Sequence, residues 1–254
     1  MAVAVVTGGS SGIGRASAVE LARRGNGVIL TYNGNATGAK EAVAAIEEAG
    51  GTAVALPLDL GDSTSFAAFA DRVGETAGSV FGTDRITALV NNGGIGGGSP
   101  FPDVTEEHFD LLNRVMFKGT YFLTQRLLPL LADGGAIVNV ASSSATTIER
   151  GGGYTAYAAV KGAIITFSQY LAVELAERRI RVNALAPGAT RTNLGDGAFD
   201  KHAHLIPALA EKTLLGRIGE PEDIALVVAV LAGEEGRWIT GQVIEATGGY
   251  QFGI

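Results

Sequence analysis

The chain has 254 residues, of which 46% are hydrophobic and 18% are charged, and its formal net charge is -7. This composition is sufficient to bury a large core, whereas the acidic balance argues against a nucleic-acid partner, because phosphate binding requires clustered Lys and Arg. Cysteine is absent and the three histidines, His108, His202 and His204, lack metal-ligand spacing, so we expect neither disulfides nor a metal site.

Short apolar runs without alternation recur along the chain, a pattern typical of strands buried on both faces of a parallel sheet. The predicted strands cover residues 3–6, 28–32, 53–58, 86–90, 136–140, 181–186 and 242–246. Segments with a 3.6-residue apolar period separate them and are predicted as helices over 13–24, 37–49, 63–77, 105–132, 154–178 and 221–233. This alternation indicates right-handed βαβ crossovers. We therefore predict an α/β fold, a Rossmann-like doubly wound parallel sheet of about seven strands, as a single domain over residues 1–254.

A glycine-rich turn follows the first predicted strand and reads Thr7-Gly8-Gly9-Ser10-Ser11-Gly12-Ile13-Gly14. Ligands of doubly wound sheets bind beyond the carboxyl ends of the strands, where glycines let the backbone approach a pyrophosphate at a helix N-terminus. The usual G-x-G-x-x-G spacing does not occur, and the alternative is a flexible connection without a ligand. The Gly-Lys pair of a P-loop is also absent, which argues against phosphoryl transfer.

Tyr157 and Lys161 are four residues apart in the predicted helix over 154–178, so their side chains lie on one face. A neighbouring ammonium stabilises a phenolate and lowers the pKa of the phenol toward neutrality, where a proton donor works best. Only one of the six tyrosines has a lysine at this spacing. The alternative is a surface pair without a catalytic role.

Several segments, read together and in order, resemble the short-chain dehydrogenase/reductase family over the whole chain. They are the turn over 7–14 (T-G-x-x-x-G-x-G), Asp59 with Leu60 after the third strand, 91–94 (Asn-Asn-Gly-Gly for N-N-A-G), the Y-x-x-x-K pair, 183–192 (N-A-x-x-P-G-x-x-x-T) and 239–241 (I-T-G). The resemblance implies an NAD(P)-dependent oxidoreductase that interconverts a ketone and a secondary alcohol by hydride transfer. Its partner would be a small carbonyl or alcohol substrate.

By resemblance, Tyr157 is the proton donor or acceptor, and Lys161 holds the cofactor ribose and lowers the pKa of Tyr157. A serine at the end of the fifth strand would bond the same substrate oxygen. The strand register gives Ser142, whereas the family's usual count back from Tyr157 gives Ser144. Because a register is harder to shift than a loop, we favour Ser142 and expect two extra residues within 143–153. The resemblance assigns the cofactor to Gly8, Ser10, Ser11, Gly12, Ile13, Gly14, Asn33, Asp59, Leu60, Asn91, Gly93, Tyr157, Lys161, Pro187, Gly188, Thr190 and Thr192.

One position departs from the family pattern. The family's N-x-x-G motif falls on residues 116–119, so Met116 takes the place of a catalytic asparagine that is thought to distort the helix and seat a water leading to Lys161. Met binds such a water poorly, and Asn113, one turn earlier, is the nearest substitute. Two alternatives stay open: a nucleotide-binding sensor or scaffold with decayed catalysis, and a Rossmann-like methyltransferase that would have no use for Tyr157 and Lys161.

Cofactor choice depends on the end of the second predicted strand, where NAD enzymes carry an acid for the ribose 2'-hydroxyl. Here the chain reads Leu30-Thr31-Tyr32-Asn33, without an acid, which favours NADP(H), with NAD(H) as the alternative. Ser11 stands where many NADP enzymes of the family have an arginine. Arg15 is a candidate for contact with the 2'-phosphate, the alternative being a side chain that faces solvent.

The segment over 189–219 is too long for a simple connection and is predicted to be a mobile substrate lid. The helices over 105–132 and 154–178 are rich in small and apolar residues. Such helices pair between subunits in this family, which implies a homotetramer or homodimer. No apolar run approaches the length of a membrane span, and the apolar start is too short for a signal peptide, so we expect no membrane partner and a cytoplasmic location.

Overall fold

Seven parallel strands form one sheet in the computed structural model, which describes residues 1–148, 153–192, 199 and 203–250. The order across the sheet is β3-β2-β1-β4-β5-β6-β7. The strands are β1 (Val3–Val6), β2 (Gly27–Tyr32), β3 (Ala53–Pro57), β4 (Ile86–Asn91), β5 (Leu131–Val140), β6 (Arg181–Pro187) and β7 (Val243–Ala246). The predicted fold class is confirmed, and each predicted strand is present.

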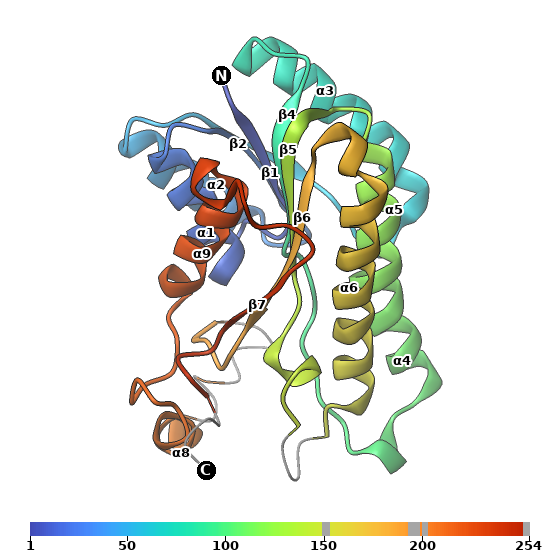
Figure 1. The fold of residues 1–254 in the computed structure, drawn as a ribbon, viewed down its shortest axis with the longest axis vertical. Coiled ribbons are helices and arrows are strands. Elements are labelled where there is room, and N and C mark those ends of the chain that lie inside the picture. The colour runs from blue at the N-terminus through green and yellow to red at the C-terminus, as the bar shows by residue number, and fades with distance from the viewer. Residues whose placement is uncertain (149–152, 193–198, 200–202, 251–254) are drawn as a thin grey trace.

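Helices cover both faces of the sheet (Figure 1). Those of the described residues are α1 (Gly12–Arg23), α2 (Ala36–Glu48), α3 (Phe66–Phe81), α4 (Glu106–Leu112), α5 (Gly119–Leu127), α6 (Thr155–Glu174), α8 (Ile206–Glu211) and α9 (Pro221–Ala232), with a π-helical turn η3 (Asn113–Lys118) between α4 and α5. Helices α1, α2 and α9 lie on one face, and α3, α5 and α6 lie on the other. Each face is sealed by an apolar cluster, one containing Leu21 and Ile46 and the other Phe66 and Leu123.

The predicted helix over 105–132 is divided in the structure. It passes through η3, and α5 then ends at Leu127. Pro129 has no N–H for a helical hydrogen bond, and Leu131 pairs with Ile86 of β4, so β5 begins where the periodicity would continue the helix. The last part of that prediction was therefore wrong, because pairing within the sheet overrides the local pattern.

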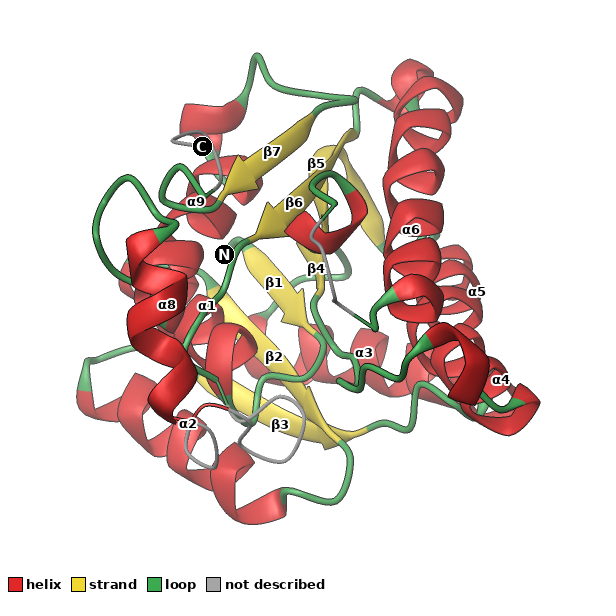
Figure 2. Ribbon diagram, turned by 90° about the horizontal axis from the view of Figure 1, so that it is seen from below, coloured by secondary structure: helices red, strands yellow, loops and turns green. Residues whose placement is uncertain are grey.

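The strand order reverses at β1, which pairs with β2 on one side and with β4 on the other. The chain consequently crosses to opposite faces from this point, and ligands of such sheets bind outside the carboxyl ends of the strands at this place. Figure 2 looks onto the edge to which the strands point. The turn over 7–14, the segment after β4 and the start of α6 all meet this edge.

A chain of buried polar side chains connects the sheet to α5 and α6. Asn91 Nδ2 donates to Thr124 Oγ1 (2.9 Å) and to Asn139 Oδ1 (2.7 Å), and Asn139 Nδ2 donates to Ser168 Oγ (2.9 Å). Ser168 Oγ donates in turn to the carbonyl oxygen of Ile164 (2.7 Å). Buried polar groups are costly without partners, so this chain fixes the position of α6 on the sheet more narrowly than apolar contacts would.

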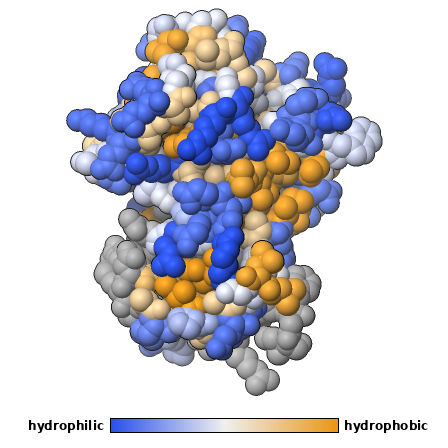
Figure 3. Space-filling view, turned by 90° about the vertical axis from the view of Figure 1, so that its left-hand side faces the viewer, coloured by the Kyte–Doolittle hydropathy of each residue, from blue (hydrophilic) through white to orange (hydrophobic). Residues whose placement is uncertain are grey.

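The face covered by α1, α2 and α9 is largely hydrophilic and carries a few apolar patches (Figure 3). Exposed apolar side chains of this side include Leu226 of α9 and, after α8, Leu214 and Leu215. Among the described residues, no helix combines the length and the apolar character that crossing a bilayer requires.

Candidate active site

The turn after β1 has a conformation that requires glycine at two positions. Gly8 has φ +66°, in the left-handed region, and a methyl group at position 14 would lie 2.2 Å from the carbonyl oxygen of Gly8. The N–H of Gly9 donates to Thr31 O (2.8 Å), which ties the turn to β2. Ser11 precedes α1 without a side-chain cap, so the first N–H groups of α1 stay available to an anion. A diphosphate group fits this cradle.

The same turn is fastened to the segment after β4. Thr7 Oγ1 accepts hydrogen bonds from the backbone N–H groups of Asn92 (3.0 Å) and Gly93 (2.8 Å). Asn92 Nδ2 donates to the carbonyl oxygen of Thr7 (3.0 Å). A methyl group at position 93 would lie 2.6 Å from Leu60 Cδ1, so glycine at that position brings Leu60 against the turn.

The residues predicted to bind a cofactor gather at the carboxyl edge of the sheet. Pro187 ends β6, the N–H of Gly188 donates to Ala246 O (3.0 Å), and Thr190 Oγ1 donates to Gly188 O (2.9 Å). A methyl group at Gly12 would lie 3.2 Å from Thr192 Cγ2, so the segment after β6 meets the glycine turn.

Three predicted cofactor residues lie at other strand ends. Asn33 and Asp59 are exposed after β2 and β3, and Asp59 Oδ1 accepts from the N–H of Gly61 (2.7 Å). Asn91 instead directs its side-chain amide into the buried polar chain. A contact of Asn91 with a cofactor stays a prediction.

Ser142 and Tyr157 form the centre of the candidate site. A hydrogen bond with the Ser142 side chain lowers the pKa of Tyr157, whereas burial, the larger effect, raises it. Ser142 Oγ accepts hydrogen bonds from Ser144 Oγ (2.9 Å) and from the backbone N–H of Ser144 (3.2 Å). Ser142 is thus the serine that hydrogen-bonds with the phenol of Tyr157, and Ser144 donates hydrogen bonds to Ser142.

Lys161 is buried beside Tyr157. Its Nζ donates to the carbonyl oxygen of Val140 (2.8 Å) and lies 5.8 Å from the centre of the Tyr157 ring. Burial lowers the pKa of Lys161 to about 8. The predicted lowering of the pKa of Tyr157 was wrong: its pKa is raised, because burial of the phenol outweighs the other effects. At neutral pH the phenol of Tyr157 is therefore protonated.

A helix distortion of the kind that the family's asparagine is thought to cause is present although Met116 replaces it. Residues from Asn113 to Lys118 form the π-helical turn η3, in which the N–H of Gly119 donates to Arg114 O. Met116 is buried in an apolar cluster with Leu112 and Val160, against which Tyr157 packs. The family's asparagine is thus not needed for the distortion itself.

Tyr154 lies at the candidate site but was not among the site residues predicted from the sequence. Its ring lies 6.2 Å from that of Tyr157, at an interplanar angle of 64°, and 51% of the residue is exposed. A methyl group at Gly98 would lie 3.1 Å from Tyr154 Cε1, and the N–H of Ser99 donates to Gly153 O (2.7 Å), so the loop after β4 flanks this ring. The three-residue spacing between Tyr154 and Tyr157 puts both rings on one helix face and could have indicated this neighbour from the sequence.

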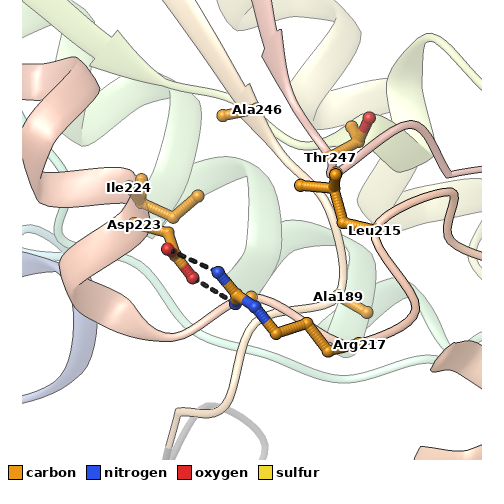
Figure 4. A pocket seen from close by; sticks show the side chains of 9 residues that line it. Ala189, Leu215, Arg217, Asp223, Ile224, Ala246 and Thr247 are labelled. Carbon is orange, nitrogen blue, oxygen red and sulfur yellow. Dashed lines mark hydrogen bonds and ion pairs between the residues drawn. The ribbon is translucent and has the colours of Figure 1, made fainter.

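The predicted lid over 189–219 is described only in part, because residues 193–198 and 200–202, including His202, lie outside the described residues. Its two ends meet: the N–H of Gly219 donates to Ala189 O (2.8 Å), and the N–H of Arg191 donates to Gly219 O (2.8 Å). A pocket at this base is lined by Ala189, Leu215, Ile224 and Thr247 and by the bidentate ion pair of Arg217 with Asp223 (Figure 4). It belongs to the lid and to α9, since Ser142, Tyr157 and Lys161 do not line it.

Comparison with known proteins agrees with this geometry. A family model described as "Enoyl-(Acyl carrier protein) reductase" matches residues 8–251. An uncharacterized oxidoreductase of Methylorubrum extorquens is 41% identical over 97% of this chain and 96% of its own length. A probable tetrahydroxynaphthalene reductase of Zymoseptoria tritici is 33% identical over 97% of this chain and 93% of its own length.

Two solved structures are similar over nearly the whole chain. The promiscuous reductase LugOII, which catalyses keto-reduction in lugdunomycin biosynthesis, has a TM-score of 0.92, is 36% identical and is matched over 99% of this chain and 98% of its own. The angucycline C-6 ketoreductase LanV with bound NADP has a TM-score of 0.92, is 34% identical and is matched over 99% of this chain and 96% of its own.

The buried ammonium of Lys161 predicts a stability effect that needs no assay of turnover. The difference between the ordinary pKa of 10.5 and about 8 corresponds to about 3 kcal/mol, a cost of folding that is present in full below pH 8 and vanishes as the pH rises toward 10.5. Lys161→Met removes this cost but leaves Val140 O without its donor, which costs about 1–3 kcal/mol. We expect the variant to be about 1 kcal/mol more stable than wild type near pH 7, measured by urea unfolding.

The difference in unfolding free energy between variant and wild type should then fall as the pH rises from about 8 to about 10. Lys118→Met, a change of an exposed lysine on η3, serves as the control and should show no such trend. A difference for Lys161→Met that stays constant with pH would contradict the burial of a charged amine.

Proposed function

The chain belongs to the short-chain dehydrogenase/reductase family, and we propose that it reduces a ketone to a secondary alcohol with NADPH, using Tyr157 as the proton donor. The observation that carries the proposal is the arrangement of Ser142, Tyr157 and Lys161 at the edge where the glycine turn lies. Structures of similar proteins hold NADP, and similar proteins are ketoreductases by name.

The protein's own groups divide the work as follows. Ser142 accepts two hydrogen bonds from Ser144, so its own O–H is left to donate, either to the Tyr157 oxygen or to a carbonyl oxygen beside it. Tyr157 gives its proton to that oxygen as negative charge develops there, which leaves a phenolate. The ammonium of Lys161 offsets the phenolate charge. NADPH, when bound, supplies the hydride that the carbonyl carbon receives.

The residues that would hold the cofactor are those of the glycine turn, Leu60, Asn33, Asp59 and the segment from Pro187 to Thr192. Arg15 is the residue that we propose for contact with the 2'-phosphate, because it lies in the first turns of α1. Its Nη1 pairs with Glu41 Oε2 of α2 at 3.1 Å, so a phosphate would compete with that carboxylate. The end of β2 has no carboxylate that would repel a phosphate, which supports NADPH over NADH.

A flat polycyclic aromatic ketone is the substrate class that we propose. Tyr154 offers an exposed aromatic face beside Tyr157, and the neighbouring loop supplies small residues at Gly98 and Ser99. Similar proteins are named for naphthalene, versicolorin and angucycline substrates, all of them fused-ring compounds. Stacking on an aromatic ring contributes about 0.5–1.5 kcal/mol.

A second copy of the chain is the partner that the surface supports. Tyr121 and Phe122 of α5 and Tyr170 and Val173 of α6 are all exposed, and Tyr121 lies 4.9 Å from Phe167 in an aromatic group. Contiguous exposed apolar side chains mark an interface, and two identical helix pairs are self-complementary about a twofold axis. The protein would work in this form in the cytoplasm.

We expect Tyr157→Phe to reduce kcat for an activated diketone with NADPH by at least about 100-fold, because general acid catalysis contributes about that much. Stabilisation by NADPH in a melting experiment should be retained. Ser142→Ala should lose more activity than Ser144→Ala, because Ser142 is the serine that contacts Tyr157.

The control is Tyr170→Phe, a change of an exposed tyrosine on the same helix. Equal rates in wild type and Tyr157→Phe, or no turnover in either with NADPH still bound, would favour a nucleotide-binding sensor, the alternative that Met116 suggests. Turnover of an enoyl thioester but of no ketone would move the assignment to carbon–carbon double-bond reduction, in line with the description of the family model.

Arg15→Ala should raise the Kd for NADPH by about fivefold to tenfold and leave that for NADH unchanged, since a charge-assisted bond to phosphate is lost. Glu41→Gln should leave NADPH binding intact or tighten it, because it frees Arg15. Arg23→Ala, at the exposed far end of α1, is the matched control. Fluorescence titration of wild type and the three variants with each cofactor gives the dissociation constants, and equal weakening of both cofactors by Arg15→Ala would contradict the assignment.

Tyr154→Ala should lower kcat/KM for a fused-ring ketone by about tenfold, the equivalent of one stacking contact, with little effect on a small aliphatic diketone. Tyr154→Phe should behave like wild type, because the ring face is kept. A loss of the same size for both ketones would show that Tyr154 supports Tyr157 rather than the substrate.

A further inference from the structure

Met116 occupies a position that the fold fixes beside the proton donor. The π-helical turn η3 turns Met116 inward, where only 1% of it is exposed. Its neighbours in the apolar cluster are Leu112 and Val160, and Tyr157 and Ile95 pack against them. Gly94 lies on the other side, since a methyl group there would be 3.5 Å from Met116 Sδ. The inner surroundings of Tyr157 are therefore hydrocarbon and thioether.

The charged and titratable groups around Tyr157 are few in the described residues. Lys161 lies on the same helix, α6, as Tyr157. Tyr154 directly precedes α6 and raises the pKa of Tyr157. Ser142, which follows β5, is uncharged. The apolar cluster contains Met116 from η3, and Ile95 from the loop after β4 packs against it. His108 of α4 is directed to Gly97. No carboxylate is among the groups that shift this pKa.

A phenolate is stabilised by hydrogen-bond donors, cations or solvent. Ser142 and Lys161 offer such groups to Tyr157, whereas the apolar wall on the side of Met116 offers none. A thioether is only a weak acceptor and donates nothing. Reduction of a ketone begins from the phenol and oxidation of an alcohol from the phenolate, so the composition of the wall affects the pH range in which each reaction runs.

We propose that Met116 is a positioning residue that sets the pH range of the reaction: its apolar side chain keeps Tyr157 protonated, so that at saturating substrate ketone reduction runs across the neutral range and alcohol oxidation reaches its full rate only in strongly alkaline solution. This inference rests on the proposed ketoreductase function. It assigns an advantage to the residue whose identity otherwise suggests decayed catalysis. The burial that raises the pKa of Tyr157 and lowers that of Lys161 agrees with it.

The test compares wild type with Met116→Asn, which adds an amide, and Met116→Leu, which keeps an apolar side chain of similar volume. The first readout is the titration of the Tyr157 phenol in the free protein, taken as the ultraviolet difference between each protein and the same protein carrying Tyr157→Phe. Met116→Asn should lower the titration midpoint by about one pH unit, and Met116→Leu should leave it unchanged. Circular dichroism and NADPH binding confirm folding, and Met116→Gln replaces Met116→Asn if that variant does not fold.

The second readout is the pH profile of turnover in both directions. At saturating substrate, Met116→Asn should move the pH midpoint of kcat for alcohol oxidation down by about one unit, in step with the phenol titration. Unchanged midpoints and profiles in folded Met116→Asn, with active wild type, would overturn this inference and leave the ketoreductase function standing. Absence of turnover in wild type would overturn the proposed function, and the phenol titration would still decide what Met116 does to Tyr157.

Discussion

The hydroxyl group of Thr7 holds together the two strand ends on which the whole site depends. It accepts hydrogen bonds from the N–H groups of Asn92 and Gly93, and so joins the turn after β1 to the segment after β4 at the place where the strand order reverses. The close approach of Gly8 and Gly14 lies within the turn that is fastened in this way. The two segments that these hydrogen bonds join continue into the anion cradle at the start of α1, the contact with Leu60 and the loop that reaches Tyr154.

Lys161 shows that a fold can hold a group whose burial lowers the stability of the protein. Lys161 is charged and buried, and its one described hydrogen bond is to Val140 O. Such a group is held in place by its surroundings, here the polar chain from Asn91 through Asn139 to Ser168, two turns along α6 from Lys161. The rigid attachment of α6 to β5 therefore serves the position of the ammonium as well as the stability of the domain.

Much of this architecture could be predicted from sequence because apolar runs and glycine turns report local requirements. The strands, the glycine turn and the pairing of Tyr157 with Lys161 belong to this class. The start of β5 did not, because Leu131 is recruited by Ile86 from a distant strand. The pKa of Tyr157 could not be predicted either, since helix spacing gives the distance to a cation but not the depth of burial, and burial decides the sign here. Ser142 could be favoured by strand register, whereas its contact with Ser144 depends on a turn that no motif encodes.

The paired backbone bonds between Ala189, Arg191 and Gly219 give the segment between them a closed neck. The same segment is also tied to the chain after β7, because the N–H of Leu215 donates to the carbonyl oxygen of Gly248 (3.1 Å). A substitution near Leu215 can therefore act on the sheet through the residues after β7 as well as through those after β6. Variation in this part of the chain is thus coupled to two neighbouring strand ends.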